Sequence, residues 1–438
     1  MRNRSIKTVS LLAALLAAAV LIFPLCGCDM LMNDDGGDQY ALSTREPEVT
    51  AAPTAEPTEE PTPEPTPEPT PEPTPEPTPI YASMGFAGDV LMMQSQISSA
   101  RVSGGYDFKP QFRPMQGLFE SVDFMVLNFE GTLAGAAAGY TEPKPEVGFQ
   151  RFNVPDEIVD DLMALGVDGF STANNHCLDK GVEGLIRTAE VMDAKGVFHT
   201  GTFTSRERQR MADIVEINGI KVGFVSTTDS VNSYDGILSS EQASYMVNRL
   251  KREQMTADAI ARCREQGAEL VVVMAHWGTQ YQQSYNQEQL SYARKLISWG
   301  ADVIIGCHPH VVQQIEWVSA QRGGKTVTAP VVYSLSNFVS NMSSAVHATD
   351  IGIFVRVDIE KSPDGSVAVT DISYTPTFDS IRWDSNGRYV NEVIPCFDDM
   401  TGVVTIAGAS YYSRGIRKAK DYCGQVISGV RILENPRA

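Results

Sequence analysis

Histidine, carboxylate and amide side chains recur in five short clusters, and each cluster directly follows a run of apolar residues. The clusters are Gly88-Asp89, Asn128-Phe129-Glu130-Gly131, Asn174-Asn175-His176 with Asp179, His276-Trp277-Gly278, and Gly306-Cys307-His308-Pro309-His310. Four of the six histidines of the chain lie in them. Imidazole and carboxylate together are the ligands typical of Mn, Fe or Zn sites, and such an ion can act as a Lewis acid. A single histidine would indicate only a structural residue, but this set predicts a metal or catalytic site.

The apolar runs before the clusters have the length and composition of buried strands. Such runs cover residues 82–87, 124–127, 169–173, 221–227, 270–276, 303–306 and 331–335, and helical patterns cover 156–165, 181–194, 246–266 and 286–300. Strands that alternate with helices of this length predict an α/β fold. In α/β sheets, ligand sites gather beyond the carboxyl ends of the strands, where these clusters would lie. Residues 352–376 alternate with period two across Pro363-Asp364-Gly365 and predict a β-hairpin.

The order of the clusters resembles that of the calcineurin-like metallophosphoesterases. Those enzymes carry two Asp motifs, Gly-Asn-His, a lone His and Gly-His-x-His after successive strands. The residues within the motifs resemble more closely those of the CapA proteins of poly-γ-glutamate capsule synthesis. Those proteins carry Asn-x-Glu, Asn-Asn-His-x-x-Asp-x-Gly, His-Trp-Gly, His-Pro-His and Ser-Leu-Gly-Asn-Phe. The last motif is present here as Ser334-Leu335-Ser336-Asn337-Phe338. The resemblance runs from about Tyr81 to Asn341. It implies a four-layer α/β/β/α sandwich of the metallo-dependent phosphatase type with a C-terminal β extension, over residues 80–438.

The resemblance also implies roles for individual residues. It places Asp89, Glu130, Asn175, His276, His308 and His310 around one or two divalent ions (Mn, Fe or Zn), His176 with Asn175 and Asp179 in the catalytic group, and Arg151, Asn337 and Trp277 in contact with substrate. His176 would be the general acid, a role suited to imidazole near neutral pH. Two departures matter, because Leu91 stands where the phosphoesterases have a histidine ligand and Glu130 replaces their bridging Asp. A two-metal centre, a single metal and a site that binds without hydrolysis therefore remain alternatives.

The N-terminus is typical of an exported protein. Arg2, Arg4 and Lys7 precede an uncharged apolar run that ends in Leu25-Cys26-Gly27-Cys28. A positive start followed by a short apolar stretch and small residues predicts a secretory signal. The ending resembles the bacterial lipobox, which implies a lipoprotein signal peptide over residues 1–28 and lipidation of Cys28. An uncleaved membrane anchor is the alternative, and both predictions place the rest of the chain outside the cytoplasm and attached to the membrane.

Residues 29–79 are rich in Pro, Thr and Glu and contain repeats of Pro-Thr-Pro-Glu-Pro. Such a segment cannot bury apolar surface, so we predict a disordered stalk, in which the proline-rich part from Pro47 to Pro79 prefers polyproline II and could reach roughly 100 Å at about 3.1 Å per residue. The whole chain has a net charge of −19, and residues 80–438 remain acidic once the stalk is set aside. This charge argues against nucleic acid as a partner. A polyanion would need a local basic or metal site to overcome it.

Three functions are compatible with these features. The first is a lipid-anchored envelope protein of the CapA type in poly-γ-glutamate synthesis or export, whose partners would be that anionic polymer and membrane-embedded capsule synthesis proteins. The second is a secreted metal-dependent hydrolase of a phosphoester or an envelope polymer. The third is a non-catalytic polymer-binding module. Among the cysteines outside the signal, Cys396 and Cys423 could form a disulfide, but their number and scatter indicate no disulfide framework.

Overall fold

The computed structural model describes residues 7–8, 78–143, 150–342, 347–383, 387, 389–397 and 409–436. These residues belong to one compact unit of the chain. Apart from residues 7–8 and 78–79, the predicted signal peptide with Cys28 and the predicted stalk lie outside the described residues. Within the described part, no helix has both the length and the hydropathy that crossing a membrane requires.

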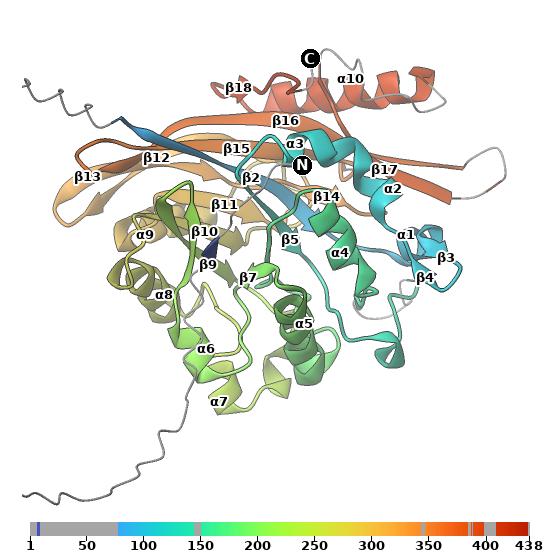
Figure 1. The fold of residues 1–438 in the computed structure, drawn as a ribbon, viewed down its shortest axis with the longest axis horizontal. Coiled ribbons are helices and arrows are strands. Elements are labelled where there is room, and N and C mark those ends of the chain that lie inside the picture. Colours follow the sequence, from blue (N-terminus) through green and yellow to red (C-terminus); the bar gives the residue numbers. More distant parts are fainter. Residues whose placement is uncertain are drawn as a thin grey trace, which may run out of the picture. The chain divides into compact units, whose positions relative to one another are not determined.

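Two large sheets form the centre of the fold (Figure 1). The first contains, in spatial order, β1 (Lys7–Thr8), β8 (Asp213–Ile217), β9 (Ile220–Thr228), β10 (Leu270–His276), β11 (Val303–Cys307), β13 (Lys325–Val332) and β12 (Ile315–Arg322). Its central strands β9, β10, β11 and β13 are parallel, whereas β8 and β12 pair antiparallel at the flanks. The parallel centre explains why its strands read as continuous apolar runs, since both faces are covered.

The second sheet joins the N-terminal and C-terminal parts of the unit. In spatial order it contains β17 (Tyr389–Pro395), β16 (Val367–Trp383), β15 (Ile351–Lys361), β2 (Ile80–Val90), β5 (Phe124–Phe129), β6 (Gly169–Ser171) and β7 (Phe198–Thr200), while β14 (Asn337–Val339) pairs with β2 and β18 (Arg431–Ile432) with β16. The strands from β2 to β7 are parallel, and β15, β16 and β17 are antiparallel. The predicted C-terminal β extension is therefore present, and it continues the sheet of β2.

Successive side chains of a strand point to opposite faces of its sheet, so the two faces of each sheet pack into different hydrophobic clusters. In β5, Phe124 and Val126 pack into a cluster that also holds Val272 and Met274 of β10, so this cluster lies between the two sheets. Met125 of β5, in contrast, faces helices on the outer side of the second sheet. The outer face of the first sheet packs against two further helices in the same way. This packing agrees with the four layers that the family resemblance implies.

The helices lie mainly outside the sheets (Figure 1). The first sheet is covered by α8 (Glu253–Glu265) and α9 (Gln287–Trp299), and the second by α1 (Gln94–Ser99), α2 (Lys109–Phe112), α3 (Gln116–Phe119), α4 (Glu157–Ala164) and α5 (Gly181–Lys195). The short helices α6 (Arg206–Arg210) and α7 (Ser240–Ala243) lie in the loops between strands and longer helices. The small strands β3 (Arg101–Val102) and β4 (Gly105–Tyr106) pair with each other. The C-terminal helix α10 (Ala409–Val426) packs on β16. The expected helices at 156–165, 181–194 and 286–300 are confirmed within a residue or two.

Two predicted elements differ from the structure. The helix expected over 246–266 begins only at Glu253, because the preceding segment runs beside strands through the bridges of Val247 to Thr202 and of Arg249 to Thr228. The strand expected over 331–335 ends at Val332, and the backbone then turns at Ser336, whose φ is 66°. The intrinsic helix and strand propensities of the residues do not predict the late start of this helix or the early end of this strand, because contacts with distant segments determine both.

The predicted hairpin over 352–376 is confirmed as β15 and β16, which pair antiparallel around a turn closed by Ser362 N donating to Ser366 O. Cys396 and Cys423 are both free thiols buried in the core between the sheets, so the disulfide is absent from the structure.

Candidate metal centre

Candidate ligands from both sheets meet at the carboxyl ends of the strands. Asp89 lies at the end of β2, Glu130 directly follows β5, His276 ends β10, and His308 and His310 follow β11. Two overlapping groups have their ligand atoms within 4.8 Å of one another, namely Glu130 with His276 and His308, and Asp89 with Glu130 and His310. The structure thus brings together five residues that are spread over more than 200 positions of the sequence, from Asp89 to His310.

Amide side chains hold these ligands in place. Asn128 Nδ2 donates to Asp89 Oδ1 at 2.7 Å and lies 3.3 Å from His276 Nδ1, while Ser171 Oγ donates to Asn128 Oδ1 at 2.9 Å. On the other side of its ring, His276 Nε2 lies 2.7 Å from Asn175 Oδ1. Asn175 therefore lies beside the cluster, as the family resemblance implies, and Asn128 links the ligands of the two sheets.

Three carboxylate oxygens at the centre of the cluster lack a donor among the described residues. Among the described residues, Asp89 Oδ2 and both Glu130 oxygens are buried and lack a hydrogen-bond partner. Glu130 Oε1 lies 3.6 Å from His276 Nε2. A buried carboxylate without a donor is costly, by at least about 1–3 kcal/mol. A divalent cation would supply the missing partner, so these residues fit a metal.

The ionisation of the cluster also suits a cation. Burial raises the pKa of Glu130, and the neighbouring charge of Asp89 raises it further. Burial lowers the pKa of His276, and burial together with His310 lowers the pKa of His308 to about 3. Although burial opposes it, the neighbouring His310, whose Nδ1 lies 3.3 Å from Asp89 Oδ2, lowers the pKa of Asp89. His276 and His308 are therefore neutral, which is the form that binds metals.

His176 forms a dyad with Asp179 at the edge of the cluster. His176 Nδ1 donates to Asp179 Oδ2 at 2.8 Å, and the same oxygen accepts from Phe152 N at 2.6 Å. The Phe152 ring packs edge-on against the imidazole, with centroids 4.6 Å apart. This arrangement fixes the ring and leaves Nε2 facing Glu130 Oε1 at 3.9 Å and Asn232 Nδ2 at 3.3 Å.

The three predicted substrate contacts have different surroundings. Trp277 is 1% exposed and donates from Nε1 to Tyr333 O at 3.0 Å, so it packs in the core in this structure, and its contact with substrate stays a prediction. Asn337 is buried, and its Oδ1 lies 2.9 Å from His310 Nδ1, which makes it a residue that orients a candidate ligand. Arg151 is exposed next to Phe152, and its contact with substrate stays a prediction.

Sequence reasoning missed residues from loops that carry no motif. Asn232 contacts both His176 and Asn175, the latter at 3.2 Å, but it lies in a loop after β9 without a recognisable pattern. Tyr281 lies with its ring 6.2 Å from that of His310 and is stacked on His347 at 4.8 Å. Its positive φ of 65° places it there, and this conformation has no signature in the sequence of a tyrosine.

Comparisons with known proteins agree with this geometry. Residues 83–342 match the family model described as bacterial capsule synthesis protein PGA_cap. The chain is 25% identical over 300 residues to the PGA biosynthesis protein CapA of Bacillus subtilis, covering 66% of this chain and 71% of that protein. It is also 25% identical over 261 residues to the capsule biosynthesis protein CapA of Bacillus anthracis, covering 59% of each.

Among solved structures, the NAD nucleotidase NadN of Haemophilus influenzae aligns with a TM-score of 0.39 and 12% identity, over 82% of this chain and 66% of that one. The family match spans more than half of the chain and contains every residue of the metal cluster. The chain belongs to the PGA_cap family of bacterial capsule synthesis proteins.

Proposed function

We propose that this protein acts in the synthesis or export of a poly-γ-glutamate capsule polymer, and that its buried cluster binds one or two divalent ions, Mn, Fe or Zn. The observation that carries this proposal is that Asp89 Oδ2 and both Glu130 oxygens lack a donor among the described residues and lie beside three histidines, within the family-matched segment. The names of the Bacillus relatives support the choice of polymer.

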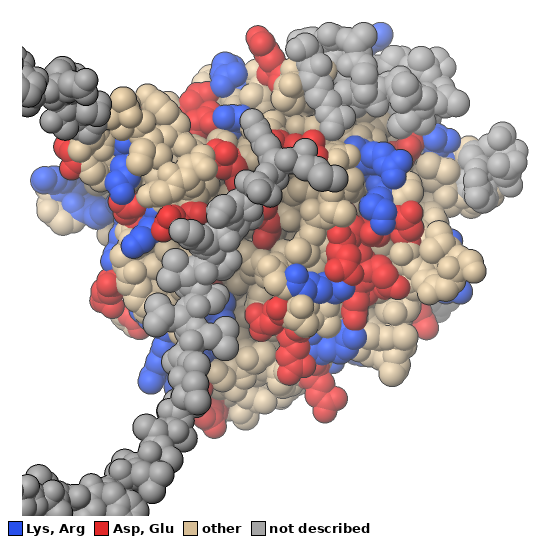
Figure 2. All heavy atoms as spheres, in the orientation of Figure 1, with Lys and Arg blue, Asp and Glu red and all other residues tan. Residues whose placement is uncertain are grey.

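A metal at this cluster would explain how an acidic protein accommodates an anionic chain. On the face that Figure 2 shows, the described Lys and Arg side chains are interspersed with Asp and Glu, without a continuous basic band. Attraction for a polyanion would therefore come from the ion, which would also act as a Lewis acid on a carbonyl or phosphoryl oxygen. Asp89, Glu130, His276, His308 and His310 would hold it.

A second candidate function is metal-dependent hydrolysis, and the His176–Asp179 dyad favours it. Asp179 accepts the proton on Nδ1, and Nε2, which Asn232 contacts, faces Glu130 and could exchange a proton with a group bound there. Against this, Leu91 is buried and supplies no ligand where the phosphoesterases have a histidine. Turnover of a phosphoester or of an amide-linked polymer by the metal-loaded protein, lost in His176→Gln, would establish the hydrolase.

The proposed location is outside the cytoplasm. Lipidation of Cys28 would anchor the chain to the membrane, and residues 29–79 would form a stalk that presents the folded unit, where membrane-embedded capsule synthesis proteins could contact it. The support is the sequence pattern alone. A Cys28→Ala variant that leaves the membrane fraction would agree with the anchor, whereas full retention would contradict lipidation.

Metal analysis and a genetic assay test the main proposal together. We expect stoichiometric Mn, Fe or Zn in the purified protein, lost when His276 and His310 are both replaced by Ala. His199→Ala is the matched control, because His199 is equally buried but pairs with Asp193 outside the cluster. In a producing strain, the double variant should reduce surface polymer and the control should not. Unchanged polymer after deletion of the gene would contradict the proposal.

A further inference from the structure

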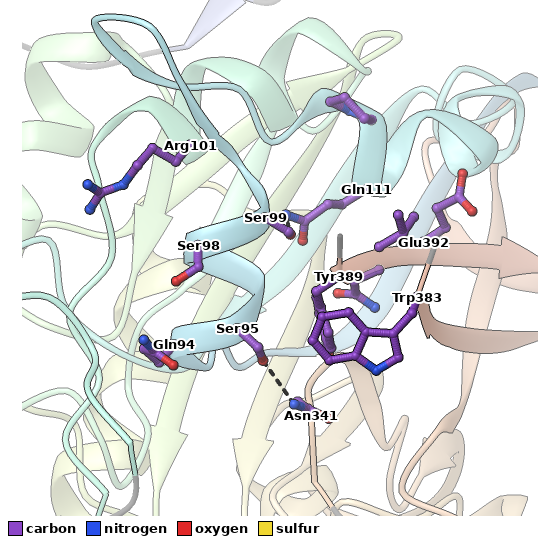
Figure 3. A pocket seen from close by; sticks show the side chains of 13 residues that line it. Gln94, Ser95, Ser98, Ser99, Arg101, Gln111, Asn341, Trp383, Tyr389 and Glu392 are labelled. Atoms are coloured by element: carbon purple, nitrogen blue, oxygen red, sulfur yellow. Dashed lines mark hydrogen bonds between the residues drawn. The ribbon is translucent and has the colours of Figure 1, made fainter. Parts of the chain in front are cut away.

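A second concave site lies outside the metal cluster, between α1 and the hairpin of β16 and β17 (Figure 3). Its volume is about 850 Å³, within the range of about 300–1,000 Å³ usual for small-molecule sites. It shares no residue with the candidate ligands. The hairpin side comes from residues beyond 342, outside the segment that matches the family model, so membership of the family assigns nothing to this hollow.

An exposed aromatic pair forms one wall. Trp383 is 71% exposed, although it is the last residue of a strand whose centre is buried. It is the cross-strand partner of Tyr389, and the two rings meet edge to face at 5.8 Å and 82°. The pairing holds the indole in place and leaves it open to a flat, partly apolar ligand. Such rings suit ligands with one apolar face and polar edges.

Hydroxyl and amide groups form the opposite wall. Ser95, Ser98 and Gln111 line it from the α1–α2 region, and Asn341 closes one end by donating from Nδ2 to Ser95 Oγ at 2.9 Å (Figure 3). Gln111 is 4% exposed and its Oε1 is a buried acceptor that lacks a donor among the described residues, as does Oδ1 of the similarly buried Asn391. A ligand rich in hydroxyl donors would complete these hydrogen bonds after small side-chain rotations.

The charges around the hollow argue against a polyanion. Arg101 points away from the aromatic wall (Figure 3), with its guanidinium 5.7 Å from the centroid of the Tyr106 ring. Glu392 is paired with Arg382 at 3.1 Å. The other described lining side chains are neutral. Among the described lining residues Arg101 is the only cation, so a poly-γ-glutamate segment stacked on Trp383 would lack a cationic partner beside the aromatic wall, whereas an uncharged ligand needs none.

We propose that this hollow binds a neutral saccharide, which stacks a sugar ring on Trp383 and hydrogen-bonds to the amides and hydroxyls opposite. Sugar rings combine an apolar C–H face with a rim of hydroxyl donors and acceptors, as the two walls require. The site would give the protein a second contact, with a glycan, that is independent of its metal cluster. This inference does not depend on the proposed polymer function.

Binding of neutral tetrasaccharides to the full chain tests the proposal. β-1,4-linked glucose, β-1,4-linked N-acetylglucosamine and α-1,4-linked glucose are titrated by calorimetry at up to millimolar concentration. We expect at least one to bind, with affinity about tenfold weaker or more in Trp383→Ala and weakened also in Asn341→Ala. Trp317→Ala is the matched control, because Trp317 is 48% exposed on β12 in the other sheet, and it should bind like the wild type.

Three results would overturn the proposal. The first is no binding of any of the three saccharides by wild-type protein whose melting temperature shows that it is folded. The second is equal binding by Trp383→Ala and wild type. The third is binding of poly-γ-glutamate that Trp383→Ala abolishes and His308→Ala leaves intact, because the hollow would then serve the polymer. A saccharide that binds normally to His308→Ala would separate this site from the metal cluster.

Discussion

Replacing Glu130 with glutamine should change the stability of the protein in opposite directions with and without metal. In the metal-free protein the Glu130 carboxyl is completely buried and neither oxygen has a donor among the described residues, which costs about 1–3 kcal/mol or more. A glutamine of the same shape carries no charge, and its amide can donate to Asp89 Oδ2, which also lacks a donor. We expect Glu130→Gln to raise the free energy of unfolding of the metal-free protein by roughly that amount.

With metal, the same change removes a ligand. A ligand present at 100 times its dissociation constant stabilises the native state by about 2.7 kcal/mol, and a tenfold loss of affinity reduces this to about 1.4 kcal/mol. Because Glu130 belongs to both candidate ligand groups, we expect at least such a loss. The metal-induced rise in melting temperature should therefore fall to half or less in the variant.

Thermal unfolding after chelation, followed by titration with Mn or Zn, measures both effects in one series. Asp161→Asn is the control, because Asp161 is also buried but accepts hydrogen bonds from Phe108 N and Lys109 Nζ away from the cluster. It should lower stability equally with and without metal. If Glu130→Gln destabilised the metal-free protein and left the metal-induced shift unchanged, the assignment of Glu130 as a ligand would be refuted.

Three further predictions address other parts of the structure. Burial raises the pKa of Asp379 from 3.8 to about 7, so the unfolded chain loses this proton at lower pH than the folded protein does. The free energy of unfolding should therefore fall between about pH 4 and 7, by up to about 1.4 kcal/mol per pH unit. Urea titrations should show a smaller fall in Asp379→Asn but an unchanged fall in Asp371→Asn, a partly exposed position on the same strand. If the protein is a hydrolase, His176→Gln should lower turnover about 10²–10⁴-fold while metal content, measured by mass spectrometry, stays unchanged. Gly88→Ala would place Cβ 1.8 Å from Ser336 O and should cost about 3 kcal/mol or more in chemical denaturation, whereas Gly236→Ala, with open space around it, should stay within about 1 kcal/mol.

The sequence predicted the fold class and the candidate ligands because both depend on local patterns. Apolar runs of strand length alternate with helical segments, and a polar cluster after each run must lie at the carboxyl edge of the sheet. Asp89, Glu130 and His276 follow this rule in the structure. The order of the strands did not follow from any such pattern, since β15 inserts beside β2 after more than 250 intervening residues.

The errors and omissions share a different cause, which is that long-range contacts decide them. Trp277 follows a ligand in sequence, yet the alternation of β10 directs it to the opposite side, against Tyr333. Asn232 contacts His176 from a loop in which two consecutive residues, Asn232 and Ser233, have positive φ. The pattern of apolar and polar residues in the sequence does not predict such a backbone conformation. The motifs therefore identified candidate ligands that lie together in the structure, but they did not say which neighbouring residues face the cluster.

The position of the cluster between two sheets bears on whether the site is vestigial. Its ligands come from β2 and β5 in one sheet and from β10 and β11 in the other, so their approach depends on the packing of Phe124 against Phe224 and of the other side chains between the sheets. A protein that had lost its metal would gain stability by replacing the donor-free Glu130 with an apolar or amide residue, because nothing in the described structure satisfies its oxygens. In this chain Asp89 Oδ2 and both Glu130 oxygens are buried without a donor among the described residues, which argues that an ion still binds between these two side chains.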